Sequence, residues 1–121
     1  MNIKMTKKLP LQYHMRLRVY REEKNFGPGV AELMQLVREK GSLSAAVKEM
    51  HMAYSKAWKI IKRAEEDLGF SLMEGQSGGE HGGRTVLTKE GEELLDRYTK
   101  FVRESQEEVN RLFRKYFETE S

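Results

Sequence analysis

Apolar side chains recur every three or four residues over the last quarter of the chain, and this long stripe constrains the fold most strongly. It predicts one helix over 88–117, with Thr88 as its N-cap. A helix of about 29 residues is roughly 43 Å long, and the small domain before it cannot cover that length. We expect its first turns to pack on their own domain and the rest to meet an identical helix. The residues predicted to form this dimer contact are Leu95, Tyr98, Val102, Val109, Leu112 and Tyr116.

The composition fits a small domain that gains stability from a second copy. The 121 residues are 38% hydrophobic and 34% charged, with a net charge of +3. The chain contains no cysteine, which excludes disulfides and thiolate metal sites. We find neither a signal peptide nor an apolar run of about 18 residues that would span a membrane. These features lead us to expect a cytoplasmic protein.

Three shorter helical patterns precede the long one. Pro28 suits the first position of a helix, and Gly41 can end that helix. Ser42 can cap a second, short helix. A tight turn at residues 51–52 then leads to a third helix over about 53–68.

The pattern changes after the third helix. Apolar positions from Phe70 onward indicate a strand, and residues 84–87 indicate a returning strand. Between them, residues 75–83 hold five glycines and no apolar side chain, so we expect a hairpin with a long tip. Strict alternation from Tyr13 to Val19 predicts one more strand, which either joins the dimer contact or extends the sheet of the hairpin.

This order of elements predicts a mainly α fold with a small β-hairpin, namely a winged helix-turn-helix followed by a long dimerisation helix. We divide the chain into a flexible tail over 1–12, a DNA-binding domain over 13–88 and the dimerisation helix over 89–118.

The third helix carries the functional prediction. Its first part, residues 53–63, has four basic side chains and no acid, and the acids begin only at Glu65. The N-terminal end of a helix also attracts phosphate through its dipole and free N–H groups. A merely solvated basic face is the alternative for an arbitrary helix, but the helix–turn–helix–hairpin order favours DNA. The residues predicted to contact DNA are Ser42, Tyr54, Ser55, Lys56, Lys59, Lys62 and Arg63, with His81 and Arg84 from the wing.

Two aromatic residues of this helix allow other interpretations. Trp58 could stack on bases in a single-strand binder, but its neighbours on the helix face are apolar, which favours packing in the core. Tyr54 begins the apolar stripe at the helix N-terminus, so both core packing and DNA contact remain open.

The segments GSLSAAVKEM, SKAWKIIKRAEEDLGFSLME and GGEHGGRTVLTKEGEELL resemble the DNA-binding domain of molybdate-responsive, ModE-type regulators, and more distantly the LysR-type winged helix. The resemblance covers about residues 13–103, and the motifs follow one another in the same order and at the same spacing as in that family. The resemblance implies a homodimer that binds a pseudo-palindromic operator in double-stranded DNA. It also implies that the helix after the wing dimerises.

The sequence departs from this family at several positions. Ala53 stands where serine usually caps the recognition helix, and Met50-His51 replaces the usual Leu-Gly. Gln76 and Ser77 occupy wing positions that are often basic. ModE-type regulators also carry C-terminal oxyanion-binding domains, and we expect none in this chain, so no effector site is predicted.

Other functions find little support in the sequence. His14, His51 and His81 fall on separate elements, so we predict no metal site, and no nucleophile and base occur together. The glycine-rich segment lacks the pattern of a phosphate-binding P-loop. We therefore predict neither an enzyme nor a cofactor. The alternative function is a protein-interaction module that uses the 88–117 helix without binding DNA.

Overall fold

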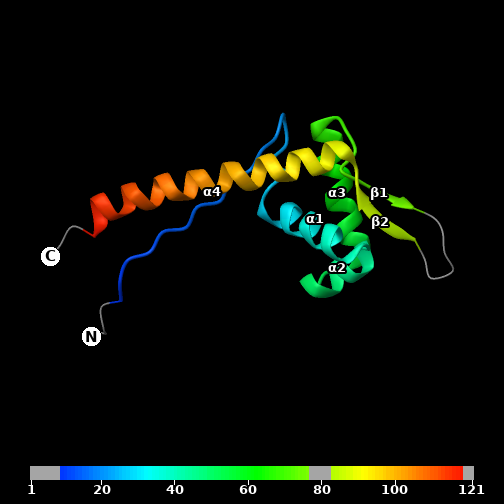
Figure 1. The fold of residues 1–121 in the computed structure, drawn as a ribbon, viewed down its shortest axis with the longest axis horizontal. Coiled ribbons are helices and arrows are strands. Elements are labelled where there is room, and N and C mark those ends of the chain that lie inside the picture. The colour runs from blue at the N-terminus through cyan, green and yellow to red at the C-terminus, as the bar shows by residue number, and fades with distance from the viewer. Residues whose placement is uncertain (1–8, 77–82, 119–121) are drawn as a thin grey trace, which may run out of the picture.

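The computed structural model describes residues 9–76 and 83–118 and shows a winged helix-turn-helix followed by one long helix (Figure 1). This confirms the predicted fold class. The elements in chain order are α1 (Pro28–Lys40), α2 (Leu43–Met50), α3 (Tyr54–Leu68), β1 (Met73–Gln76), β2 (Arg84–Leu87) and α4 (Lys89–Phe117).

The helix boundaries follow from local chemistry. Gly41 and Gly69 adopt left-handed φ angles of 78° and 91° after α1 and α3, as glycine permits. The Ser42 side chain caps α2 by accepting a hydrogen bond from the Ala45 N–H at 3.0 Å. His51 takes the left-handed conformation that ends α2, with φ 54° and ψ 47°, so the turn keeps its shape without the glycine usual in the family.

The core lies where α1, α2 and α3 meet the hairpin and the first turns of α4. Leu33, Leu43, Ile61, Leu72 and Leu95 come from five separate segments, and all are buried. Arg38 of α1 also forms ion pairs with Glu92 at 2.8 Å and Asp96 at 3.2 Å. The start of α4 is thus part of the domain, while the rest of the helix extends away from it (Figure 1).

The hairpin is tied to the helices through Thr85. Met73 pairs with Leu87 and Gln76 with Arg84 in an antiparallel register. The Thr85 N–H donates to the Gly41 carbonyl at 3.0 Å, and its buried hydroxyl accepts from the Leu43 N–H at 3.2 Å. These bonds hold the wing beside the junction of α1 and α2.

The first strand of the hairpin starts later than predicted. It begins at Met73, whereas the sequence pattern indicated Phe70. The Leu72 N–H donates to a carboxylate oxygen of Glu65 at 2.8 Å, and the Met73 N–H lies 3.4 Å from the same oxygen. The chain after α3 is therefore held by a side chain before strand pairing begins.

The strand predicted from Tyr13 to Val19 is wrong. We call residues 9–19 the N-terminal segment; it is extended, and exposure alternates over 13–19, but its only strand-like contact within the described chain is an isolated bridge between Val19 and Phe26. It does not extend the sheet of the wing. The Tyr98 hydroxyl of α4 donates to the Leu17 carbonyl at 2.8 Å. A helix therefore buries the apolar face of this segment.

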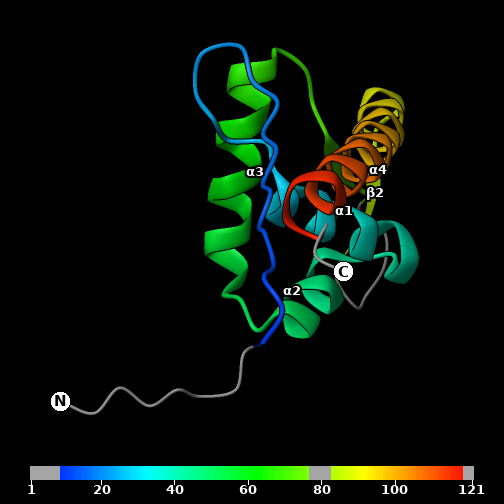
Figure 2. The same cartoon turned by 90° about the vertical axis from the view of Figure 1, so that its left-hand side faces the viewer.

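The far end of the N-terminal segment also lies on α4. The Tyr13 hydroxyl is hydrogen-bonded to Asn110 and Gln106, and its ring centroid is 5.0 Å from that of Phe113. Figure 2 shows the segment running between α3 and α4. Of the predicted tail over 1–12, residues 1–8 lie outside the described part of the chain.

Candidate nucleic-acid interface

The α3 helix separates a buried face from a basic one. Ala57, Ile61 and Ala64 are buried in the core. On the outward side, Lys56 and Lys59 are exposed, as are three further predicted contacts. These are Ser55, Lys62 and Arg63. The predicted arrangement of charge on α3 is therefore present at its surface.

The N-terminus of α3 is open. Within the described part of the chain no side chain caps α3, because Ala53 occupies the cap position and has no polar atom. The first N–H groups of a helix have no partner inside it. They and the helix dipole thus favour an anion at this end, next to Ser55 and Lys56.

The two aromatic residues of α3 differ in environment. Trp58 is partly buried and packs against the core. Tyr54 is 48% exposed, and its ring lies 6.4 Å from that of Trp58 in an edge-on arrangement. Lys62 lies 5.5 Å from the centre of the Trp58 ring and 3.6 Å from Glu65. Tyr54 is therefore available for a ligand, whereas Lys62 already has neighbours.

The predicted wing residues are only partly described. Arg84 is exposed at the start of β2. Its guanidinium lies next to Gly41, 3.8 Å from the position that a Cβ atom on Gly41 would occupy. Ser42 follows directly, so Arg84 and Ser42 lie at the same corner of the domain. His81 lies outside the described residues.

A basic cleft beside α3 was not predicted from the sequence. It has a volume of about 230 Å³, and Arg16, Arg18 and Lys24 line it together with Met52 and Ile60. The alternation of residues 13–19 had marked Arg16 and Arg18 as outward-facing. Their position next to α3 depends on the tertiary fold.

The opposite end of α3 is acidic. Glu22, Glu23, Glu66 and Asp67 gather there around Arg63. Three backbone N–H groups, those of residues 21–23, each donate to Asp67 at 2.8 Å. These bonds lower the pKa of the Asp67 carboxyl below its usual value. Charge thus changes sign along α3, and the basic end is the one suited to DNA.

The apolar stripe of α4 is covered in two different ways. Leu95 and Tyr98 are buried in the domain at 1% and 6% exposure, and the N-terminal segment covers the flank at Gln106 and Asn110. Phe117 is exposed at the end of α4, and three large side chains before it also stay open. They are Phe101, Leu112 and Tyr116, at 50%, 39% and 65% exposure. Of the other predicted dimer residues, Val102 and Val109 are half-buried.

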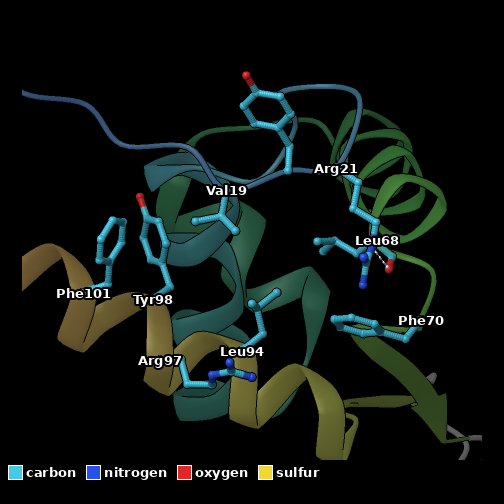
Figure 3. Close-up of a pocket in the computed structure, with 9 residues that line it drawn as sticks. Val19, Arg21, Leu68, Phe70, Leu94, Arg97, Tyr98 and Phe101 are labelled. Atoms are coloured by element: carbon cyan, nitrogen blue, oxygen red, sulfur yellow. Dashed lines mark hydrogen bonds between the residues drawn. The ribbon is translucent and has the colours of Figure 1, made fainter.

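An apolar groove adjoins this open stripe near the domain. It has a volume of about 500 Å³, and Leu68, Phe70, Leu94 and Phe101 are among its walls (Figure 3). Arg21 lies across one side, where its Nε donates to the Leu68 carbonyl at 2.8 Å. Phe101 belongs both to the groove and to the open stripe, so the two surfaces are continuous.

The described residues contain neither a candidate metal site nor a membrane-spanning helix. No group of three or more histidine, aspartate or glutamate residues there could hold a metal ion. No helix in the described ranges is long and apolar enough to cross a membrane.

Comparison with known proteins identifies the family. The pattern of the bacterial regulatory helix-turn-helix proteins of the lysR family matches residues 31–92, about half of the chain. The molybdenum-pterin-binding protein MopB of Rhodobacter capsulatus is 33% identical over 66 residues, which are 54% of this chain and 24% of MopB. The transcriptional regulator ModE of Haemophilus influenzae is 31% identical over 71 residues, 59% of this chain and 28% of ModE. The chain therefore spans about a quarter of the length of these relatives.

Solved structures share the fold. The DNA-binding domain of CbnR in its complex with DNA has a TM-score of 0.54 at 23% identity, over 69% of this chain and 90% of that one. ArgP of Mycobacterium tuberculosis has a TM-score of 0.52 at 25% identity, over 73% of this chain and 31% of ArgP. The chain belongs to the lysR family of bacterial regulatory helix-turn-helix proteins, and it contains the winged helix-turn-helix DNA-binding domain of that family.

Proposed function

We propose that the protein acts as a homodimer that binds a pseudo-palindromic operator, with one α3 helix in each of two successive major grooves. The observation that carries this proposal is the acid-free, exposed basic face at the uncapped N-terminal end of α3. Two recognition helices of such a dimer are spaced about 34–36 Å apart, one turn of the duplex.

Each residue has a role that follows from its place on α3. Tyr54, Ser55, Lys56 and Lys59 are exposed on the first turns, which are the part of a recognition helix that reaches base edges. Arg63 lies further along on the side of the phosphate backbone, and the acidic group around it weakens its contact there. Lys62 supports the backbone contact less strongly, because Trp58 and Glu65 already hold it.

The wing and the start of α2 contact the backbone at a second place. Arg84 supplies a charge and Ser42 a hydroxyl donor at the same corner of the domain. Phosphate contacts of this kind fix the orientation of a protein on DNA rather than its sequence preference. We also assign His81 to the wing contact from the sequence alone.

The open stripe of α4 supports the dimer. Large apolar side chains on a long helix need a partner, and the N-terminal segment covers only one flank. A second α4 running antiparallel with the two-fold axis near Val109 brings Phe101 to within one residue of the level of Tyr116, and Ser105 to within one residue of the level of Leu112. Large and small side chains then alternate along the contact, and the end of the partner helix reaches the Phe101 edge of the groove in Figure 3.

The charges on the free flank of α4 support the same register. In this arrangement Glu104 of one copy lies within one residue of the level of Lys115 of the other, and Glu108 within one residue of the level of Arg111, which it already pairs with at 2.9 Å inside its own chain. Each exposed pair contributes little energy by itself. Charges flanking a helix pair nevertheless select its orientation and register, because a displaced register places like charges opposite each other.

Salt dependence of DNA binding tests the role of α3. The logarithm of the binding constant falls with the logarithm of salt concentration, with a slope of about −0.9 per neutralised phosphate. Lys56→Ala or Lys59→Ala reduces the magnitude of the slope by about one if that lysine touches phosphate. Lys100→Ala removes the same charge from α4 and serves as the control. If the slope is unchanged in both α3 variants, Lys56 and Lys59 do not contact phosphate.

The same titration on random duplex at low salt separates the proposal from its alternative. A wild-type protein that binds no duplex under these conditions would instead support the protein-interaction module that uses α4. Because the match covers only 28% of ModE, we carry no ligand site of that protein over to this chain.

Sedimentation tests the dimer and its register. Leu112→Asp places a charge in the open stripe and is expected to yield monomers. Glu104→Lys with Glu108→Lys brings like charges together in the proposed register and weakens the dimer. Adding Lys115→Glu and Arg111→Glu restores opposite pairs and recovers association. Failure of the fourfold variant to recover would contradict the register, while monomeric wild-type protein would contradict the dimer.

A further inference from the structure

The cleft between the N-terminal segment and α3 is strongly basic. Arg16 and Arg18 alternate with the residues that face α4, and Lys24 reaches the cleft from the turn before α1. None of the described residues that line this cleft is acidic, although acids are nearly as frequent as bases in the chain. Like charges that gather without counter-charges repel one another, so the cluster suits an anionic partner.

The cations are held on a fixed backbone. The Tyr98 hydroxyl binds the Leu17 carbonyl, which lies between the two arginines. The Val19 N–H donates to the Phe26 carbonyl at 2.9 Å. The Arg18 side chain packs over Gly27, with its Cγ 3.0 Å from the position that a Cβ atom on Gly27 would occupy. Little backbone entropy is therefore lost when a ligand engages this surface.

The cleft is continuous with the basic face of α3. Met52 and Ile60 line it from α3 and the turn before it, and Ile60 lies between Lys56 and Arg63 on one side of that helix. The wing and the N-terminal segment leave the domain on opposite sides of α3 (Figure 1). A recognition helix in a major groove is bordered by one phosphate strand on each side, since the groove is about as wide as the helix.

We propose that Arg16, Arg18 and Lys24 bind the DNA strand that borders the major groove on the side away from the wing. This inference rests on the proposed function, and it adds a second backbone contact to it. The wing and the basic cleft then hold the duplex from two sides while α3 enters the groove between them. The acidic group around Asp67 lies at the other end of α3 and keeps the phosphates toward its N-terminal half.

The test uses the whole chain and the double variant Arg16→Gln with Arg18→Gln. Glutamine keeps the Cβ and Cγ atoms, so the packing over Gly27 is retained. The slope of log affinity against log salt should fall in magnitude by about one for each arginine that neutralises a phosphate. The loss should be equal on operator and random duplex, because backbone contacts carry no base information.

The matched control removes two charges elsewhere. Lys100→Gln with Arg103→Gln lowers the net charge equally but changes exposed residues of α4. Its slope should stay at the wild-type value. Hydroxyl-radical footprinting should also show that the Arg16/Arg18 variant loses protection of the sugar-phosphate strand on one side of each half-site, while the protection given by the wing remains.

The outcomes distinguish this inference from the proposed function. If the wild-type protein does not bind duplex DNA, both the proposed function and the cleft contact are refuted. If the wild-type protein binds DNA and the Arg16/Arg18 variant keeps the wild-type slope and footprint, only the proposed phosphate contact of the cleft is refuted. If the double variant fails to fold, Lys24→Gln measures the same slope from the turn, and an unchanged slope there would count against the cleft as well.

Discussion

Replacing Gly91 by alanine should separate α4 from the hairpin. Gly91 is buried in the first turn of α4 against the backbone that leads into β1. A Cβ atom there would lie 2.1 Å from the Leu72 carbonyl oxygen and 2.9 Å from its carbon. The same oxygen accepts a hydrogen bond from the Thr88 N–H at 3.0 Å. A backbone cannot turn aside as a flexible side chain can, so the two elements must move apart.

The expected loss follows from opposing effects. Alanine is favoured over glycine inside a helix by about 1 kcal/mol. Overpacking costs about 1–3 kcal/mol. The movement also strains the Thr88 contacts, including the bond of 2.6 Å from its hydroxyl to the Ser71 carbonyl, and a hydrogen bond contributes about 1 kcal/mol. We therefore expect the free energy of unfolding to fall by about 2 kcal/mol in balance.

Urea denaturation at fixed protein concentration, followed by circular dichroism, measures this change. Gly29→Ala is the control, because a Cβ atom at that position in α1 meets nothing within 4 Å. The control should leave the free energy of unfolding unchanged or raise it by up to about 1 kcal/mol. If Gly91→Ala were as stable as Gly29→Ala, close backbone approach would not be what places α4 on the domain.

Two further substitutions test contacts within the domain. Thr85→Val keeps the shape of the side chain but leaves the buried Leu43 N–H without its acceptor. The free energy of unfolding should therefore fall by about 1–3 kcal/mol. A loss no larger than that of an exposed substitution such as Ser44→Ala would contradict this prediction. Asp67→Asn should destabilise the protein at neutral pH, because the folded pKa of this carboxyl is depressed by three backbone donors. Its stabilising effect is present above the unfolded pKa of about 3.9 and is lost as pH falls through the lower folded pKa. Unfolding measured over a pH series should therefore show the gap between wild type and Asp67→Asn closing in acid, and a gap independent of pH would refute this.

Most of the fold could be predicted because its signals are local. Ser42 and Thr88 are side chains that cap helices in any context, and Gly41 and Gly69 end helices because they accept positive φ. The buried face of α3 follows from helical spacing alone. The start of β1 was misplaced because Glu65, a residue of the preceding helix, binds the backbone at Leu72 and Met73.

The N-terminal segment shows what a pattern leaves open. Alternation from residue 13 to 19 establishes that one face is buried, but not what buries it. A neighbouring strand is the usual partner, whereas here Tyr13 meets Asn110 of α4, almost the whole length of the chain away. No local signal links positions so distant.

The same limit applies to the candidate interface. The exposed residues of α3 were predictable from one helix and its charge pattern. The cleft of Arg16, Arg18 and Lys24 requires the N-terminal segment, the turn before α1 and α3 to meet. The charges were visible in the sequence, but their common location is a property of the tertiary structure.

The start of α4 connects the interface to the proposed dimer. Gly91 against Leu72, Arg38 with Glu92 and Tyr98 with Leu17 fix the direction of α4 relative to α3 within one chain. The separation of two α3 helices in the proposed dimer then depends on where the two α4 helices cross and at what angle. A register shift of one helical turn displaces each domain by about 5.4 Å, a substantial part of the roughly 34 Å between equivalent groove faces. In the proposed dimer the α4 register therefore sets the operator spacing, and we expect a register variant to remain fully dimeric while it loses the operator.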